Sequence, residues 1–257
     1  MKRFWFIAIV MATVTKSGQA QPQTDDHDLA FGLAYDALIL GISRSIELSF
    51  KAAHPPAYDR FPTHDIDHRF RLFWHGKTIN APASPNEERA ANASDFLVAG
   101  LMVTSMSLGI RRHPTAKAAL TLTHTLSQTH LLTTILKRGI RRPRPKEVYF
   151  PVPKPHPSVY TSFPSGHSSQ AFAAATAALL MAPDLDFWPK AGLWAGAGLV
   201  ASLRISADKH FLSDVVVGGL FGFWVANMTY DAMHQEPSRH SVKIGIIPGR
   251  VSLTYEF

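Results

Sequence analysis

The sequence predicts an all-α fold, a bundle of helices that ends in a short β-hairpin. Five apolar or small-residue runs hold no Asp, Glu, Lys or Arg and indicate buried helices: 96–110, 118–136, 168–181, 191–203 and 215–230. Only residues 241–247 and 251–257 are rich in β-formers, and Pro248-Gly249 between them predicts a hairpin turn. The chain has 257 residues, is 46% hydrophobic and shows no repeat, so it can bury one core.

The N-terminus has the pattern of a secretory signal. Met1-Lys-Arg precedes the apolar run 4–14, and Ser17-Gly-Gln-Ala20 offers small residues for cleavage after Ala20. We expect residues 1–20 to be removed and the protein to be exported, to the periplasm or the envelope membrane. An uncleaved anchor is the alternative, although this run is shorter than the roughly 20 residues that span a bilayer.

The rest of the chain, 21–257, is expected to form one domain with three parts. Residues 21–93 form a helical and loop segment, with an amphipathic helix predicted over 29–50 and a proline-broken polar stretch over 51–92. Residues 94–236 form the core, which Ser94 and Asp95 are predicted to open as a helix N-cap. Residues 237–257 form the hairpin tail.

Histidines outside the main motifs have simpler interpretations. His64 and His68 lie four residues apart, a spacing that two metal ligands on one helix face can have. We favour the more common structure for such a pattern, a solvated helix turn with its charges outward. His124 and His130 fall in the run 118–136 and are predicted to be packed core residues.

Charge and cysteine content restrict the function. The net charge is +7, much of it in residues 137–146. A nucleic-acid surface is one interpretation of this cluster, but its interspersed prolines and the lack of stacking aromatics favour a compact anion site, so no nucleic-acid partner is expected. The absence of cysteine excludes disulfides and thiolate metal sites.

Residues 163–167, Phe-Pro-Ser-Gly-His, directly precede the predicted helix 168–181. The first N–H groups of a helix have no internal partner and bind anions well, which makes Ser165 and Gly166 candidates to hold a phosphate. Upstream, Lys137 closes an apolar run that Gly139 is expected to end, and Arg144 follows seven residues after the lysine. Both cations can therefore face one anion.

A third motif lies downstream. His210 follows Arg204 by six residues, and Asp214 follows His210 by four. The four-residue spacing stacks His210 and Asp214 on one helix face. The carboxylate can then hold the imidazole.

Together, the three motifs resemble the type 2 phosphatidic acid phosphatase (PAP2) family. They are Lys-x6-Arg-Pro from Lys137, Pro-Ser-Gly-His ending at His167, and Arg-x5-His-x3-Asp from Arg204. That family shares its site with bacterial non-specific acid phosphatases and vanadium haloperoxidases. The resemblance covers roughly residues 94–231 and implies a helical bundle of the PAP2 and acid phosphatase type. It departs from the family pattern in one place, because Leu203 precedes Arg204 where serine is often found and Ser202 lies one position earlier.

The resemblance implies a role for each motif residue. His210 is the expected nucleophile, forming a phosphohistidine while Asp214 fixes its tautomer, and His167 is the expected general acid. The phosphate is expected to bind to five residues: Lys137, Arg144, Ser165, Gly166 and Arg204. No metal and no cofactor are expected, because three cations can neutralise the phosphate, and vanadate is expected to inhibit.

Residues 143–157 contain six prolines, which favour an extended, stiff segment. We expect this segment to form a loop over the mouth of the site. Tyr149, Phe150 and Tyr160 could then line the leaving-group side, or could serve packing alone.

The function we expect is an exported phosphatase for phosphomonoesters or lipid phosphates. Two alternatives are a vanadate-dependent haloperoxidase and a non-catalytic, membrane-associated phosphate-binding protein. The charge-free runs are mostly shorter than the roughly 20 residues that cross a bilayer, which slightly favours a shallow or soluble bundle over an integral one. A membrane nevertheless remains a candidate partner of this protein. The sequence does not indicate the oligomeric state.

Overall fold

A computed structural model describes residues 26–51, 65–75, 85–149, 151, 157–234, 241–247 and 250–256. This part of the chain is helical apart from one hairpin, so the all-α prediction is confirmed. In order, its elements are α2 (Asp26–Lys51), α3 (Asp65–His75), α4 (Pro85–Arg112), α5 (Thr115–Ile140), α6 (Pro145–Tyr149), the 3-10 turn η1 (Pro157–Tyr160), α7 (Gly166–Met181), α8 (Phe187–Ser206), α9 (Leu212–His234), β1 (Ser241–Ile247) and β2 (Arg250–Glu256). Residues 1–20 and the signal predicted there lie outside the described residues.

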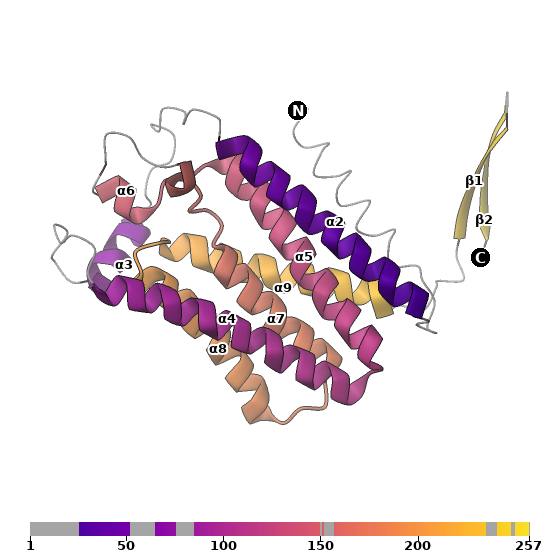
Figure 1. Ribbon diagram of the computed structural model, residues 1–257, viewed down its shortest axis with the longest axis horizontal. Helices are drawn as coiled ribbons and strands as arrows, with labels where there is room; N and C mark the ends of the chain where they lie inside the picture. The colour runs from indigo at the N-terminus through magenta and orange to yellow at the C-terminus, as the bar shows by residue number, and fades with distance from the viewer. Residues whose placement is uncertain are drawn as a thin grey trace.

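Helix α7 is the central element of the bundle (Figure 1) and packs against α4, α5, α8 and α9. Its alanines are fully buried, and they let neighbouring helices approach closely. The closest approach is to α9, where a Cβ on Gly218 would lie 2.7 Å from Ser165 O and one on Gly222 would lie 2.0 Å from Ser169 O. These two glycines therefore form a tight packing face on α9.

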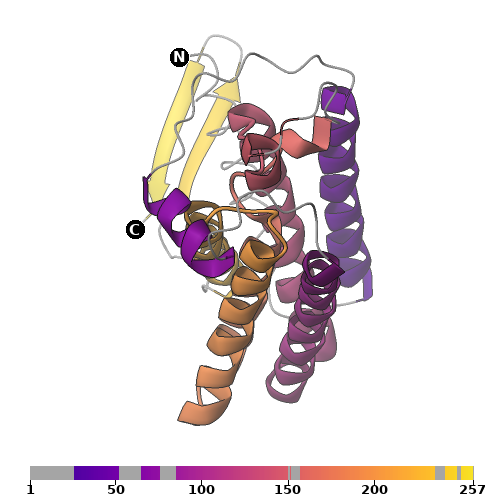
Figure 2. The same cartoon turned by 90° about the vertical axis from the view of Figure 1, so that its left-hand side faces the viewer.

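Helix α2 lies at the outside of the bundle and packs along α5. Seen from the end that carries α3 (Figure 2), α2 and α8 lie on opposite sides of the molecule. Strands β1 and β2 pair antiparallel, with Ser241 opposite Glu256 and Ile247 opposite Arg250, as the hairpin prediction requires.

Two predicted helix ends are wrong. Helix α4 begins at Pro85, nine residues before the predicted N-cap, so Ser94 and Asp95 lie inside the helix and the predicted start of the core falls within it. Helix α5 does not end at Gly139 but continues to Ile140. Arg141 adopts the left-handed conformation (φ 56°) and closes the helix by donating its N–H to Lys137 O.

The helices are longer than the charge-free runs suggested, because polar and charged residues extend them at both ends. Among the described residues, three segments are long and apolar enough to cross a membrane: Leu29–Ser49, Asn86–Arg112 and Leu212–His234. The short length of the charge-free runs therefore no longer supports a shallow or soluble bundle over an integral one.

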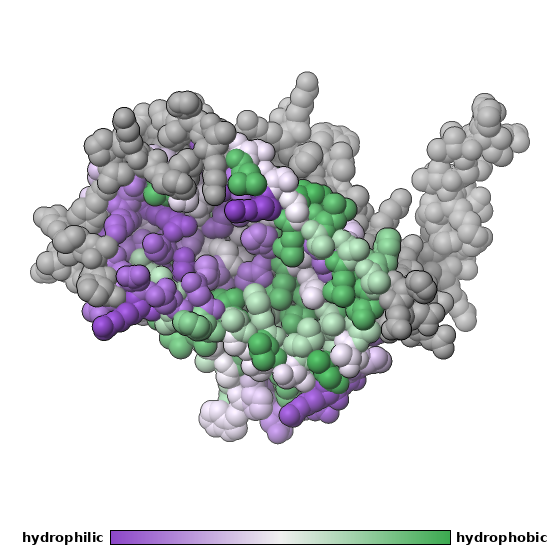
Figure 3. Space-filling view, in the orientation of Figure 1, coloured by the Kyte–Doolittle hydropathy of each residue, from purple (hydrophilic) through white to green (hydrophobic). Residues whose placement is uncertain are grey.

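The outer faces of these helices expose large apolar side chains. Examples are Phe31, Leu38 and Leu48 on α2, Phe96 and Val103 on α4, and Val216 and Leu220 on α9. Figure 3 shows an apolar surface over α2, α4 and α5 beside a polar end near α3 and α6. Such a large exposed apolar surface is typical of a protein that contacts lipid, and it agrees with the predicted membrane association.

Candidate active site

The three motifs meet at one end of the bundle, around a cavity of about 310 Å³. Helix α5 ends there, α7 begins, α8 ends and α9 begins. Six predicted site residues line the cavity, namely Lys137, Arg144, Gly166, His167, Arg204 and His210. Ser165 and Asp214 lie behind this lining and are fully buried.

Ser165 caps helix α7. Its backbone is extended (φ −71°, ψ 114°) and its Oγ accepts hydrogen bonds from Ser168 N at 3.4 Å and Ser168 Oγ at 3.1 Å. Its own N–H donates to Asp214 O at 2.9 Å and is not free for a phosphate, which corrects the expectation that this N–H binds the anion. The N–H groups that open α7 beyond the cap remain suited to an anion.

Gly166 lies close to the predicted phosphate ligand on α5. A Cβ at this position would lie 3.5 Å from Lys137 Cε and 3.8 Å from Thr133 Cγ2. These are ordinary contacts, so the protein itself does not require glycine here. The missing side chain instead keeps the space beside Lys137 open.

Four cations line the cavity, and the three predicted phosphate ligands among them, which are buried or half-buried, have few partners; the fourth is Arg138. Lys137 Nζ donates to Thr161 O at 2.7 Å, and Arg204 Nη1 donates to Ser94 Oγ at 3.1 Å. The buried Nε atoms of Arg144 and Arg204 have no hydrogen-bond partner.

Burial lowers the pKa of all three groups. The pKa of Lys137 falls to about 7, because of burial and the neighbouring charge of Arg144. The pKa of Arg204 falls to about 10, again because of burial and Arg144, and the pKa of Arg144 is lowered chiefly by burial. An anion among these groups would relieve the unfavourable energy that these shifts express.

His210 is 2% exposed and lies deep in the site. Burial, then the charges of Lys137, Arg144 and Arg204, lower its pKa well below the ordinary value, so the ring is neutral near pH 7. A neutral imidazole is the form that can act as a nucleophile.

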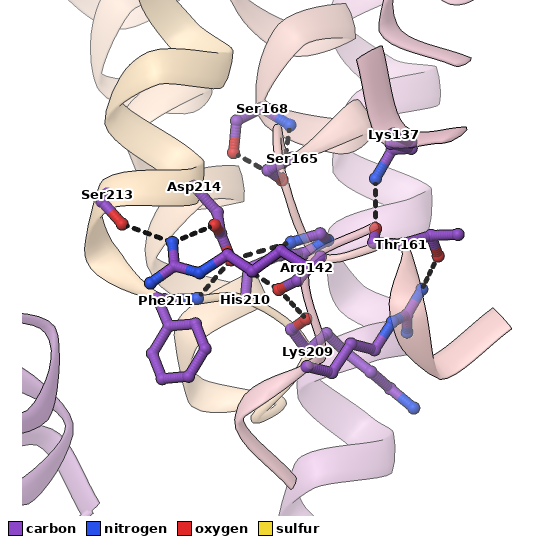
Figure 4. Close-up of polar contacts among 12 residues, drawn as sticks. Lys137, Arg142, Thr161, Ser165, Ser168, Lys209, His210, Phe211, Ser213 and Asp214 are labelled. Carbon is purple, nitrogen blue, oxygen red and sulfur yellow. Dashed lines mark hydrogen bonds and ion pairs between the residues drawn. The ribbon is translucent and has the colours of Figure 1, made fainter. Parts of the chain in front are cut away.

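Asp214 does not hold His210 as predicted. Figure 4 shows the Asp214 carboxylate and the contacts that it makes with other residues. Its Oδ1 accepts a hydrogen bond from Arg142 Nη1 at 2.6 Å, and its Oδ2 accepts from Ser162 Oγ at 2.5 Å and from Phe211 N at 2.8 Å. His210 Nδ1 lies 3.7 Å from Asp214 Oδ2 and has no hydrogen-bond partner. The three other donors already occupy the carboxylate, which is why the four-residue spacing alone does not produce the bond.

His167 pairs with a carboxylate that the sequence did not reveal. Its Nε2 lies 2.6 Å from Asp95 Oδ1, and Arg204 Nη1 lies 3.7 Å from the same oxygen. Burial and Arg204 lower the pKa of His167 to about 4, although Asp95 acts to raise it. No motif marks Asp95, which lies in the middle of α4.

Arg142 is a second residue that the sequence analysis missed. Besides Asp214, it contacts Asp67 Oδ2 through Nη2 at 2.8 Å and Ser213 Oγ through Nη1 at 2.7 Å, and it lies over the Phe211 ring. Its only sequence signal was membership of the basic cluster 137–146.

Asp67, on α3, is 1% exposed and also accepts from Ser213 N at 2.8 Å. The predicted solvated turn with outward charges is therefore wrong for Asp67. His68 contacts Tyr149 Oη through Nδ1 at 2.7 Å, and His64 lies outside the described residues. Across the chain that the structure describes, no group of three or more His, Asp or Glu side chains could hold a metal ion.

Helix α3 also holds the loop between α8 and α9. Arg71 makes two 2.8 Å hydrogen bonds to Asp208, a residue in the left-handed conformation (φ 50°), and lies over the Tyr149 ring. Trp74 Nε1 donates to Ser206 Oγ at 2.6 Å. This loop joins Arg204 to His210, so α3 fixes the spacing of two predicted site residues.

The remaining expectations have mixed outcomes. Tyr149 contacts His68 and Arg71 of α3 and does not line the cavity. Tyr160 is buried and does not line it either. Phe150 lies outside the described residues. His124 is a packed residue as predicted, with Nδ1 2.7 Å from Asp36 Oδ2. His130 lines the cavity and is not simply a core residue, which corrects its prediction.

Two curated relatives are both named lipid A 1-phosphatase. The protein from Rhizobium johnstonii is 36% identical over 106 residues, 38% of this chain and 41% of the relative. The protein from Porphyromonas gingivalis is 29% identical over 94 residues, 35% of this chain and 21% of the relative. The chain thus covers less than half the length of either relative.

Among solved structures, the crystal structure of Aquifex aeolicus LpxE aligns with a TM-score of 0.42 and 24% identity, over 74% of this chain and 93% of that one. Residues 117–238 match the family model described as the PAP2 superfamily. This segment contains all eight residues predicted to act on or bind the phosphate. Over these residues, just under half of its length, the chain is similar to the PAP2 superfamily.

Proposed function

We propose that this protein is a membrane-bound phosphatase that hydrolyses a phosphomonoester of a lipid. The observation that carries the proposal is the meeting of Lys137, Arg144 and Arg204 around one cavity that also holds a neutral histidine, His210. The cations suit the phosphate oxygens and the histidine suits attack on phosphorus.

The first chemical step is attack by His210. Because Nδ1 is the atom turned toward Asp214, Nε2 is the atom that attacks. Its lone pair forms a bond to phosphorus, the phosphorus–oxygen ester bond breaks, and the leaving oxygen takes that electron pair. As positive charge grows on the ring, Asp214 attracts Nδ1–H across the 3.7 Å gap.

His167 supplies the proton to the leaving oxygen. Its low pKa leaves it neutral in the free protein near pH 7, and the negative charge of an incoming phosphate raises that pKa. In the second step a water molecule gives its proton to His167 and attacks phosphorus. The phosphorus–nitrogen bond then breaks, and its electron pair returns to Nε2.

The lipid nature of the substrate is supported by the position of the site. The cavity lies at one end of a bundle that has three helices able to cross a membrane, so a head group at the membrane surface could reach it. The two relatives named lipid A 1-phosphatase also support a lipid phosphate. The predicted signal at residues 1–20 further supports export to the envelope.

The test is turnover by the purified full chain in detergent. Short-chain phosphatidic acid and 4-nitrophenyl phosphate serve as esters, and released phosphate is measured. His210→Ala should lower the rate by at least about a thousandfold, because loss of a nucleophile removes the covalent route.

His113→Ala is the matched control. His113 lies at the opposite end of the bundle, where its Nε2 contacts Met181 O, and this variant should keep the wild-type rate. Unchanged activity in His210→Ala would refute the covalent mechanism. Phosphate binding by the wild type with no turnover of either ester would point instead to a phosphate-binding protein.

A further inference from the structure

The cavity has a second wall that the phosphate chemistry does not use. Beside the cations, α5 and α7 contribute polar uncharged side chains, among them His130, Thr133 and Gln170. We call Thr133 and Gln170 the polar wall. Together they flank the start of α7, because Gln170 lies one turn after Gly166 and Thr133 Cγ2 lies 3.8 Å from the Cβ position of Gly166.

Both members of the polar wall have a buried atom without a hydrogen-bond partner. Thr133 is 3% exposed, and its Oγ1 makes no hydrogen bond. Other threonines of α5 bond back to a carbonyl four residues earlier: Thr121 to Lys117 O, Thr125 to Thr121 O and Thr129 to Thr125 O. The hydroxyl of Thr133 departs from this pattern at a turn of α5 that borders Gly166.

Gln170 has a satisfied donor and an unsatisfied acceptor. Its Nε2 donates to Leu126 O at 3.0 Å, which fixes the orientation of the amide, and its Oε1 has no partner. Unsatisfied buried polar atoms are rare in folded proteins and call for an explanation. Two of them on one wall of one cavity point to a ligand.

The chemistry of the two atoms limits that ligand. An amide oxygen only accepts hydrogen bonds, so Gln170 Oε1 requires a donor. A phosphate dianion and the ester carbonyls of an acylglycerol offer no donor. A hydroxyl or an amide N–H does, and the hydroxyl of Thr133 can pair with either a donor or an acceptor.

We propose that Thr133 and Gln170 form a subsite for the leaving alcohol, and that this alcohol carries hydroxyl or amide N–H groups next to the ester carbon, as a polyhydroxylated head group does. The proposal rests on the proposed function, because the cations fix where the phosphate lies. Thr133 is one turn before Lys137 on the same face of α5, so the subsite borders the phosphate directly.

The experiment compares two esters on purified full-length protein. Glucose 1-phosphate has hydroxyls next to its ester carbon, whereas 4-nitrophenyl phosphate has no donor. Thr133→Val and Gln170→Met keep the side-chain size and remove the polar atoms. Each should lower the ratio of kcat/KM for glucose 1-phosphate to kcat/KM for 4-nitrophenyl phosphate by about tenfold, the usual effect of one lost hydrogen bond to a ligand.

Thr129→Val and Gln128→Met are the matched controls. Both residues are buried and hydrogen-bonded within the protein, Thr129 to Thr125 O and Gln128 to Thr229 Oγ1. These variants should leave the ratio unchanged even if they lower stability. An equal loss on both esters in Thr133→Val would mean that Thr133 contacts the phosphate, and it would overturn the subsite.

A binding measurement separates this proposal from the proposed function. Glucose 1-phosphate should raise the melting temperature of the inactive His210→Ala protein more than inorganic phosphate does, and Thr133→Val should abolish the difference. Equal stabilisation by the two ligands would overturn the subsite whatever the rate of turnover. Absence of turnover with this difference intact would overturn the phosphatase and leave the subsite standing.

Discussion

Four arginines at the same end of the bundle have opposite surroundings. Arg142 and Arg71 are fully engaged by carboxylates, the first by Asp67 and Asp214 and the second by Asp208. Arg144 and Arg204 face the cavity, and each has a buried Nε without a partner. The first pair holds the loops together, whereas the second pair is left to bind something from outside.

This contrast separates arginines that stabilise the fold from arginines that are placed to bind a ligand. A buried ion pair loses much of its stability when one partner is removed, because the other charge stays buried and uncompensated. A buried cation that no carboxylate engages through hydrogen bonds instead makes the free protein less stable and is retained for its ligand. Substitutions in the two pairs should therefore have opposite effects on stability and on catalysis.

The largest effect is expected at Arg142. Arg142→Ala leaves Asp67 and Asp214 without their shared cation, and it should lower the free energy of unfolding by about 3–5 kcal/mol. The measurement is denaturant unfolding in detergent. The double variant Asp67→Asn with Arg142→Ala should recover part of this loss, because it removes one of the uncompensated charges. Wild-type stability in Arg142→Ala would mean that the paired arginine is dispensable.

Arg204→Gln should have the converse effect. The neutral amide can no longer stabilise charge on the phosphate, so kcat/KM for 4-nitrophenyl phosphate should fall by about 10²–10³. The melting temperature of the free protein should stay the same or rise, because one of three clustered cations is gone. A lower melting temperature with wild-type activity would reverse the assignment of the two pairs.

Sequence reasoning recovered the elements and the cavity residues because both depend on local signals. Charge-free runs marked the helices, and the resemblance of three motifs to the PAP2 family implied that Lys137, His167 and His210 share one site, where the structure places them. It could not separate Arg142 from Arg144. These lie two residues apart in one basic cluster, and what distinguishes Arg142 is its ion pair with Asp67, 75 residues earlier in the chain.

Competition between partners explains the other failures. The spacing of His210 and Asp214 was compatible with a hydrogen bond, but Arg142, Ser162 and Phe211 already occupy the carboxylate. Asp95 gave a helix-start signal, yet α4 had begun ten residues earlier and left its carboxylate facing His167. Tertiary contacts decide such cases, and no local pattern records them.

A smaller effect is expected in the pH dependence. The pKa of Lys137 is about 7, so its positive charge is present below that pH and is lost as the pH rises through it. For this reason kcat/KM should fall about tenfold per pH unit above this value. Lys137→Arg should move this alkaline limb to higher pH, because arginine stays charged. Arg142→Lys should leave the limb where it is, and an unmoved limb in Lys137→Arg would mean that another group titrates.

The smallest effect is expected at Asp95. Asp95→Asn removes the negative charge beside His167, which lowers the pKa of the ring further and makes it harder to protonate. We expect a loss of about three- to tenfold for alkyl phosphates, which need the proton. The loss for 4-nitrophenyl phosphate, which has a good leaving group, should be smaller. Equal losses on both esters would indicate that Asp95 acts through Arg204 and not through His167.

The central claim, that the cations facing the cavity and His210 form a phosphate-transfer site, is tested most directly by a structure of the protein with inorganic vanadate. Vanadate adopts the five-coordinate geometry of phosphoryl transfer. The account predicts a bond from vanadium to His210 Nε2, with the equatorial oxygens contacting Lys137, Arg144 and Arg204 and no contact to Arg142 or Arg71. Vanadate bound to His167, or held by Arg142 after displacement of Asp214, would contradict the account.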